Sequence, residues 1–156
     1  MSKIIFKIND PDQEKVYTES LKGSVDFFNS HRIVTTWPQK DVDKEYDTEA
    51  YMVFKSRIEE EWKQKENKFL NKIETLFNLK FDEPFEVYIS NYGVGGCYNS
   101  PRKITINKQL PYNHVSNIKH EIIHLLIEPF IKEYNIDFNR KESIVEAILG
   151  VLESQD

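Results

Sequence analysis

The sequence predicts one α+β domain that spans residues 1–156. Short segments of alternating or β-branched apolar residues predict strands, and longer segments with apolar residues at every third or fourth position predict helices. Strands are expected at residues 4–8, 85–90 and 103–107. A chain of this length can bury roughly two thirds of its unfolded surface. Its hydrophobic content of 39% is enough for one core.

The first elements are a strand and a capped helix. Ile4, Phe6 and Ile8 lie at alternate positions, as in a short strand. The segment Asp10-Pro11-Asp12-Gln13 then combines an N-cap, a proline at the first helical position and a capping-box glutamine. Gly23 is expected to close this helix. Residues 31–37 have the composition of a strand, which Pro38 would end.

A long amphipathic helix is expected from about residue 45 to residue 78. Its apolar residues recur at helical spacing, and they are Tyr46, Ala50, Phe54, Ile58, Trp62, Phe69, Ile73 and Leu76. This stripe is expected to face the core. In the alternative, the helix offers the stripe to a partner protein.

Two strands and a turn-rich loop precede the most informative helix. Residues 85–90 and 103–107 read as strands, and the glycines at 93–96 lie between them. No Lys-Ser/Thr follows these glycines and no helix begins there, so a phosphate-binding loop is disfavoured. Asn113 is expected to cap the helix that follows.

His120-Glu121-Ile122-Ile123-His124 forms the pattern HExxH, which combines two metal ligands with a general base. On a helix the two imidazoles point from one face and can share one ion. The five-residue pattern alone arises by chance in roughly one of ninety such chains, so its context matters. The apolar residues Val115, Ile118, Ile122, Leu125 and Leu126 lie on the opposite side of the helix. In the alternative, the histidines are core side chains bonded to backbone carbonyls, or are simply exposed.

A third ligand is expected downstream, because a catalytic zinc ion takes three protein ligands and keeps one open position. Pro129 is expected to end the HExxH helix, and Asn135 with Asp137 mark a second break, so a following helix can double back. That helix carries Glu142 and Glu146 on one face. If Asn139 caps it, Glu142 is used in a capping box and Glu146 is the ligand. If Asp137 caps it, Glu142 remains free, which is the preferred interpretation.

These residues resemble the zincin metalloproteases, specifically the gluzincin branch that includes thermolysin. The resemblance covers residues 85–153 and depends on HEIIH and the downstream Glu-x-x-x-Glu. The chain lacks the third histidine of the metzincins and is much shorter than thermolysin, so it is most similar to small single-domain bacterial gluzincins. The resemblance implies Glu142 as the third zinc ligand and Glu146 as the carboxylate that orients His120.

The resemblance also implies a zincin-like fold, a reaction and a cleft. The fold would be a small mixed or antiparallel sheet packed on a long backing helix and the HExxH helix, with a C-terminal helix carrying the third ligand. Zn²⁺ would activate water and polarise a peptide carbonyl, with Glu121 as general base. Tyr134 is the candidate oxyanion stabiliser. Residues 94–98 would form an edge strand that pairs with a peptide substrate. Cys97 would either reach the cleft as an inhibitory ligand or be a small buried residue.

Composition narrows the function further. A net charge of −5 without clustered Lys and Arg disfavours nucleic acid as a partner. No apolar run suits a membrane span or a signal peptide, and one cysteine fits a reducing compartment, so a cytoplasmic protein is expected. The expected partner is a peptide or protein substrate; the sequence does not indicate an oligomeric state. The alternatives are a non-catalytic interaction protein with a structural or vacant metal site, and a zinc hydrolase of a non-peptide amide.

Overall fold

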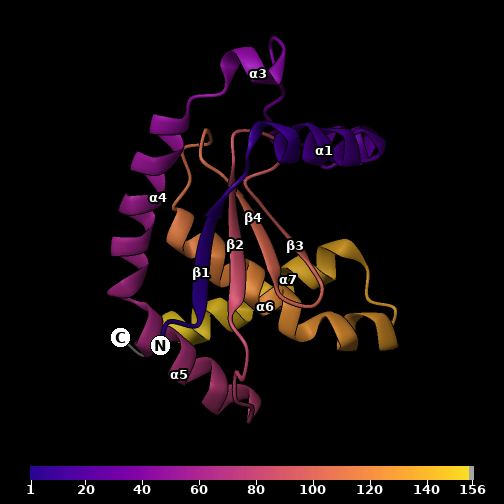
Figure 1. Ribbon diagram of the computed structural model, residues 1–156. Coiled ribbons are helices and arrows are strands. Elements are labelled where there is room, and N and C mark those ends of the chain that lie inside the picture. The colour runs from indigo at the N-terminus through magenta and orange to yellow at the C-terminus, as the bar shows by residue number, and fades with distance from the viewer. Residues whose placement is uncertain (155–156) are drawn as a thin grey trace.

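The computed structural model describes residues 1–154 and contains a four-stranded mixed sheet with helices around it (Figure 1). The strands are β1 (Ile4–Ile8), β2 (Phe85–Ser90), β3 (Gly96–Asn99) and β4 (Lys103–Asn107), in the spatial order β1-β2-β4-β3. β2 runs parallel to both β1 and β4, whereas β3 is antiparallel to β4. The α+β class, the mixed sheet and the three strands expected from the sequence are therefore confirmed.

The helices follow one another in two groups, separated by the strands β2 to β4. The first group is α1 (Pro11–Leu21), a 3₁₀ turn η1 (Lys22–Ser24), α2 (Val25–Ser30), α3 (Val42–Glu45), α4 (Thr48–Lys63) and α5 (Glu66–Phe77). The second group is α6 (His114–Glu133) and α7 (Phe138–Glu153). In Figure 1, α6 crosses behind the sheet, and α1 lies across the end at which β1 finishes.

The core lies between one face of the sheet and the helices α4, α5, α6 and α7. Alternate strand residues such as Val87 and Ile104 are fully buried, as the pleat of a strand requires. Ile118 and Ile122 of α6 are fully buried against them. This packing fixes the rotation of α6 about its axis, and so decides which side chains of α6 face outward.

The N-terminal helix begins as the sequence predicts. The side chain of Asp10 accepts a hydrogen bond from the backbone N–H of Gln13, and the Gln13 side chain accepts from the N–H of Asp10. α1 ends at Leu21 with Lys22 as its C-cap, so Gly23 directly follows the cap, as expected for the residue that closes the helix. Its backbone then continues within η1.

Residues 31–37 do not form the expected strand. Their backbone makes a single antiparallel bridge, between Thr36 and Gly93. The Thr36 hydroxyl donates to the carbonyl of Asn91, and the Asn107 amide donates to that hydroxyl. Side-chain hydrogen bonds thus hold this segment at one point. Its β-branched residues do not pair with a neighbouring strand of the described residues.

The helix expected at 45–78 is two helices. α4 ends at Lys63 and α5 begins at Glu66, with a turn in which the Lys65 N–H donates to the carbonyl of Trp62. The buried Glu66 carboxylate accepts hydrogen bonds from the backbone N–H groups of Lys3 and Ile4. The break allows α5 to turn and hold the N-terminal strand, a constraint that apolar periodicity does not reveal.

Pro129 does not end the HExxH helix, contrary to the expectation. α6 continues through Pro129 to Glu133. Ile127 and Ile131, on either side of the proline, are buried in the core. Their burial offsets the roughly 3 kcal/mol that an internal proline costs a helix. Asn135, with a positive φ of 47°, makes the turn that follows.

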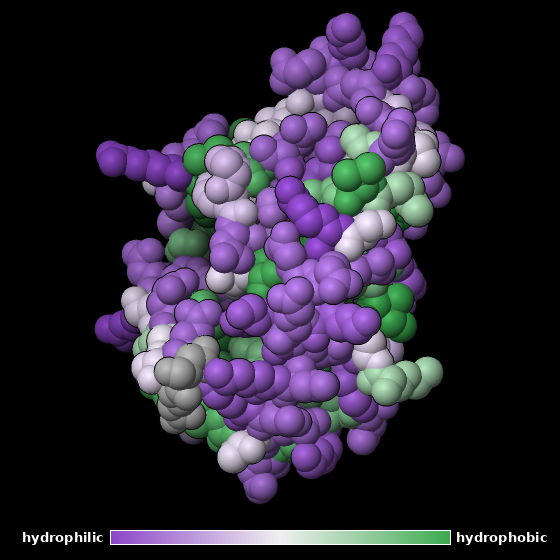
Figure 2. Space-filling model, turned by 90° about the vertical axis from the view of Figure 1, so that its left-hand side faces the viewer, coloured by the Kyte–Doolittle hydropathy of each residue, from purple (hydrophilic) through white to green (hydrophobic). Residues whose placement is uncertain are grey.

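The face along α4 and α5 is mainly hydrophilic, with scattered apolar side chains (Figure 2). Met52 and Val53 are exposed there, whereas Phe54, Ile58 and Trp62 of the predicted stripe are buried. Phe69 and Ile73 are buried as well, whereas Leu76 is 50% exposed, so most of the stripe belongs to the core but its last residue does not. Within residues 1–154, no helix has both the length and the apolar character that a membrane span requires.

Candidate metal centre

α6 presents two histidines toward α7. The Asn113 side chain caps α6 by accepting a hydrogen bond from the Ser116 N–H, which confirms the predicted start of the helix. The buried isoleucines of α6 face the sheet, so His120 and His124, four residues apart, emerge on the side where α7 packs. His124 is almost fully buried, and His120 is partly buried.

α7 folds back against α6 and brings its own polar face to these histidines. Asp137 caps α7 by accepting from the Arg140 N–H, so Glu142 is not used as a capping residue. Val145, Leu149 and Leu152 anchor the opposite face of α7 in the core. Glu142 is thereby left free to face α6.

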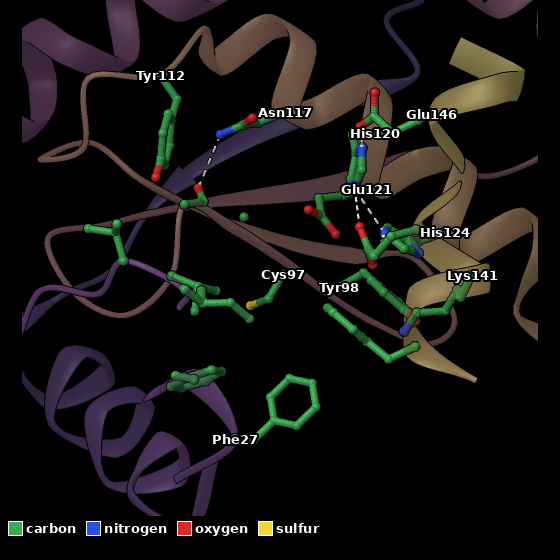
Figure 3. Close-up of a pocket in the computed structure, with 18 of the residues that line it drawn as sticks. Phe27, Cys97, Tyr98, Tyr112, Asn117, His120, Glu121, His124, Lys141 and Glu146 are labelled. Atoms are coloured by element: carbon green, nitrogen blue, oxygen red, sulfur yellow. Dashed lines mark hydrogen bonds and ion pairs between the residues drawn. The ribbon is translucent and has the colours of Figure 1, made fainter. Parts of the chain in front are cut away.

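Three ligand atoms converge between the two helices (Figure 3). The Nε2 atoms of His120 and His124 lie 3.0 Å apart. One oxygen of Glu142 lies 3.2 Å from Nε2 of His120, and the other lies 3.2 Å from Nε2 of His124. His120, His124 and Glu142 form a cluster that could hold a metal ion.

The spacing of this cluster fits a small divalent cation. With metal–ligand bonds of about 2.0–2.1 Å, tetrahedral geometry separates neighbouring ligand atoms by about 3.3 Å, close to the observed separations. The Nε2 atoms of His120 and His124 both face the Glu142 carboxylate. A cation among these groups would be bound by two imidazole nitrogens and one carboxylate.

The Nδ1 atoms of the two histidines have different contacts. Nδ1 of His120 lies 3.0 Å from an oxygen of Glu146, the carboxylate one turn beyond Glu142 on α7. Such a contact fixes the ring and leaves Nε2 available for a metal. Nδ1 of His124 is buried and has no hydrogen-bond partner among residues 1–154.

The charges of the cluster suit metal binding. Burial alone would raise the pKa of Glu142, but hydrogen bonds from His120 and His124 lower it to about 2, so the carboxylate is ionised at neutral pH. Burial lowers the pKa of His124 and keeps it neutral. For His120, burial also acts downward, but the neighbouring carboxylates of Glu142 and Glu121 outweigh it and raise the pKa.

Glu121 lies beside this cluster and lines the same cavity. Its side chain is only 6% exposed, and burial raises the pKa of Glu121 to about 7. The carboxyl group can therefore exchange a proton near neutral pH, as a general base must. Gly96 makes room for it, because a Cβ atom at that position would lie 2.7 Å from Oε1 of Glu121.

The cluster opens onto a cavity of about 530 Å³. One wall is the edge strand β3 with the glycines Gly95 and Gly96, and the opposite wall carries apolar side chains that include Phe27 and Val34. Figure 3 shows Phe27 across the cavity from the histidines. The cavity can thus accept an extended ligand that has an apolar group.

Two residues singled out from the sequence do not join the cluster. Tyr134 is the C-cap of α6, is 62% exposed and packs against Phe130 with the two rings tilted by 43°. It does not line the cavity, and its role as oxyanion stabiliser stays a prediction. Cys97 lines the wall, but its sulfur lies 3.3 Å from the Tyr17 hydroxyl and, in Figure 3, points away from His124.

Sequence reasoning missed Tyr98, Glu128 and Lys141. Tyr98 and Lys141 line the cavity, and the Tyr98 hydroxyl bonds to both other residues. The sequence did place two of them close to candidate ligands. Glu128 lies four residues after His124, on the same helix face, and Lys141 directly precedes Glu142.

Comparison with protein-family models, with curated proteins and with solved structures finds no match to this chain. We therefore infer its function from the residues of the site.

Proposed function

We propose that the protein is a zinc-dependent metallopeptidase with a zincin-like, gluzincin-type site. The observation that carries this proposal is the convergence of His120, His124 and Glu142 beside the buried Glu121, at the base of an open cavity. Two imidazole nitrogens and one carboxylate are a ligand set that zinc uses in catalytic sites, where a fourth position stays open. Glu146 supports the set by orienting His120.

The residues divide the chemistry among them. When bound, zinc supplies a Lewis acid that lowers the pKa of a coordinated water and polarises a carbonyl group. Glu121 accepts a proton from the attacking water and delivers it to the leaving amine. Its burial keeps the carboxyl group in a state that can do both near neutral pH. The cavity is lined by β3, which is an edge strand of the sheet and can pair with the backbone of an extended peptide.

An open cavity above the histidines favours this function over a non-catalytic interaction protein. Five residues of the apolar stripe are buried in the core and only Leu76 is exposed; the buried five are Phe54, Ile58, Trp62, Phe69 and Ile73. The cavity of about 530 Å³, in contrast, is lined by His120, His124 and Glu142 and is within the size range of ligand pockets. A zinc hydrolase of a non-peptide amide would use the same residues, so only the substrate distinguishes it from a metallopeptidase.

The test combines metal content with a variant of the general base. Purified protein loaded with zinc and desalted is expected to retain one ion per chain, and to cleave members of a peptide library. Glu121→Gln keeps the size of the side chain but removes the base, so zinc content is expected to persist while cleavage falls at least about a hundredfold. Mass spectrometry of the products and metal analysis measure both.

Glu133→Gln is the matched control, because Glu133 ends the same helix outside the cavity. Its cleavage rate is expected to equal that of the wild type. Cleavage that is insensitive to Glu121→Gln, or a zinc content near zero, would contradict the proposal. Cleavage of small amides but of no peptide would assign the non-peptide reaction instead.

A further inference from the structure

His124 differs from His120 in what holds its ring. His120 has a carboxylate on its second nitrogen, at 3.0 Å. His124 has no hydrogen-bond partner on Nδ1 among residues 1–154, although that atom is buried. The His124 side chain is only 3% exposed. The orientation of its ring therefore depends on the atoms that pack against it.

The His124 ring makes a T-shaped contact with the His120 ring and a stacked contact with the ring of Tyr98 on β3. The Tyr98 and His124 rings have centroids 4.8 Å apart and planes inclined by 13°. Stacked aromatic rings at this separation attract each other beyond the effect of burial alone. The stack blocks rotation of the imidazole about its bond to Cβ, because an imidazole turned out of the stacked plane would collide with the phenol ring.

The phenol ring is itself anchored. The Tyr98 hydroxyl donates a hydrogen bond of 2.7 Å to Glu128 and accepts one of 3.1 Å from the Lys141 ammonium. That ammonium also lies 5.5 Å from the centre of the Tyr98 ring, within the range of a cation–π attraction. Both anchors carry charge, which makes the hydrogen bonds stronger than neutral ones.

The anchors lie on the elements that carry the ligands. Glu128 is one turn beyond His124 on α6, and Lys141 directly precedes Glu142 on α7. One side chain of β3 therefore ties together the strand, the histidine helix and the glutamate helix.

We propose that Tyr98 is a positioning residue that holds the His124 ring in the orientation required to bind the metal ion. The inference rests on the proposed function, because it needs the metal site. A ring that is already immobilised loses less freedom when a ligand binds, so the affinity is higher. In other metal sites, loss of a partner that orients a ligand lowers metal affinity about ten- to hundredfold.

Zinc affinity of single variants, measured by competition with a chromophoric chelator, tests this role. Tyr98→Leu removes the stacked ring and is expected to lower the affinity about ten- to hundredfold. Tyr98→Phe keeps the ring but loses both hydrogen bonds, so its affinity is expected to lie between those of the wild type and Tyr98→Leu. Tyr112→Leu is the matched control, because Tyr112 lines the same cavity and packs on Gly95. Its affinity is expected to equal that of the wild type.

The visible spectrum of bound Co²⁺ supplies a readout that a general loss of stability would not change, since its bands report coordination geometry. The bands are expected to shift in Tyr98→Leu and to stay in place in Tyr112→Leu. If the wild type binds zinc but Tyr98→Leu matches it in affinity and spectrum, the role of Tyr98 is overturned and the proposed function stands. If the wild type binds neither metal, both are overturned.

If Tyr98→Leu does not fold, its zinc affinity carries no information. Two smaller substitutions therefore complete the experiment. Tyr98→Phe and Tyr112→Phe each remove one hydroxyl from the same cavity. Weaker zinc binding in Tyr98→Phe alone supports the positioning role, and equal affinities overturn it.

Discussion

At the scale of single residues, the site depends on one glycine as much as on its charged groups. Gly96 lies on β3 opposite Glu121, and the carboxylate occupies the space that any larger side chain would fill. This close approach places a buried carboxyl group beside the two histidines. The conformational freedom of glycine is not the reason for its presence here; the absence of a Cβ atom is.

Gly96→Ala is expected to displace Glu121 while leaving the metal ligands in place. The new Cβ would lie 2.7 Å from Oε1 and 3.2 Å from Cγ of Glu121, so the carboxylate must shift. A displacement of about 1 Å can cost a hundredfold in rate, so peptide cleavage is expected to fall about that far while zinc content stays at one ion per chain. Gly23→Ala is the control, since nothing lies within 4 Å of a Cβ there. Equal cleavage by the two variants would show that Glu121 does not act from this position.

At the scale of elements, α7 brings two carboxylates to α6, and their roles differ by one helical turn. Glu142 contacts Nε2 of both histidines, whereas Glu146 contacts Nδ1 of His120. The cap at Asp137 sets where α7 begins, and the buried Val145 sets its rotation. A slip by one residue in either feature would bring neither carboxylate to the histidines.

The two carboxylates are expected to differ in how much zinc binding depends on them. Glu142→Ala removes a ligand and is expected to abolish tight binding. Glu146→Ala removes only the group that orients His120 and is expected to weaken zinc affinity about ten- to hundredfold. Calorimetric titration of both variants measures the difference. The reverse order of severity would identify Glu146 as the ligand.

The start of α6 carries a histidine with a structural role. The His114 ring packs edge-on against Phe54, and its Nε2 lies 3.2 Å from the carbonyl of Asn107. Burial lowers the pKa of His114 below its ordinary value of 6.5. Its position at the positive end of the helix acts in the same direction.

Stability is expected to depend on His114 in a defined pH range. Because the folded-state pKa lies below the unfolded value of 6.5, the unfolded state binds more protons as the pH falls below that value. The contribution is therefore complete above about pH 6.5 and is lost at lower pH. Urea unfolding of zinc-free wild type and His114→Gln at pH 7.5 and pH 5 isolates it, because the other titrating groups are common to both. A larger acid-induced loss in the variant would contradict the expectation.

At the scale of the whole molecule, the cluster of His120, His124 and Glu142 lies between two helices, and each helix packs on different elements of the fold. α6 packs on β3 and β4, α7 packs on α6 and α5, and the cavity reaches across to α2. An ion held between α6 and α7 would add a contact that exists only in the folded chain. Metal binding at this cluster would therefore be coupled to folding.

Zinc is expected to raise the melting temperature of the protein. At a free concentration of one hundred times Kd, binding adds about 2.7 kcal/mol, which corresponds to roughly 5–10 °C for a domain of this size. A chelator is expected to reverse the shift, and Glu142→Ala to abolish it. Differential scanning calorimetry measures each melting temperature. An equal zinc-dependent rise in Glu142→Ala would show that the ion binds elsewhere.

The sequence by itself determined the features that depend on residues within one or two helical turns. The caps at Asp10 and Asn113, and the pairing of His120 with His124 on one face, follow from local spacing and from short-range hydrogen bonds. Three strands of the sheet, β1, β2 and β4, carry alternating or β-branched patterns that are equally local.

The tertiary structure decided what depends on residues far apart in the chain. The break before Glu66, the continuation of α6 through Pro129 and the single bridge at Thr36 each reflect packing against segments that are distant in sequence. The approach of Glu142 to both histidines, and of Tyr98 to His124, requires α7 and β3 to pack on α6. Apolar periodicity reports which face of an element is buried, but not what it is buried against. For that reason the ligand candidates and Glu146 could be named in advance, whereas Tyr98, Glu128 and Lys141 could not.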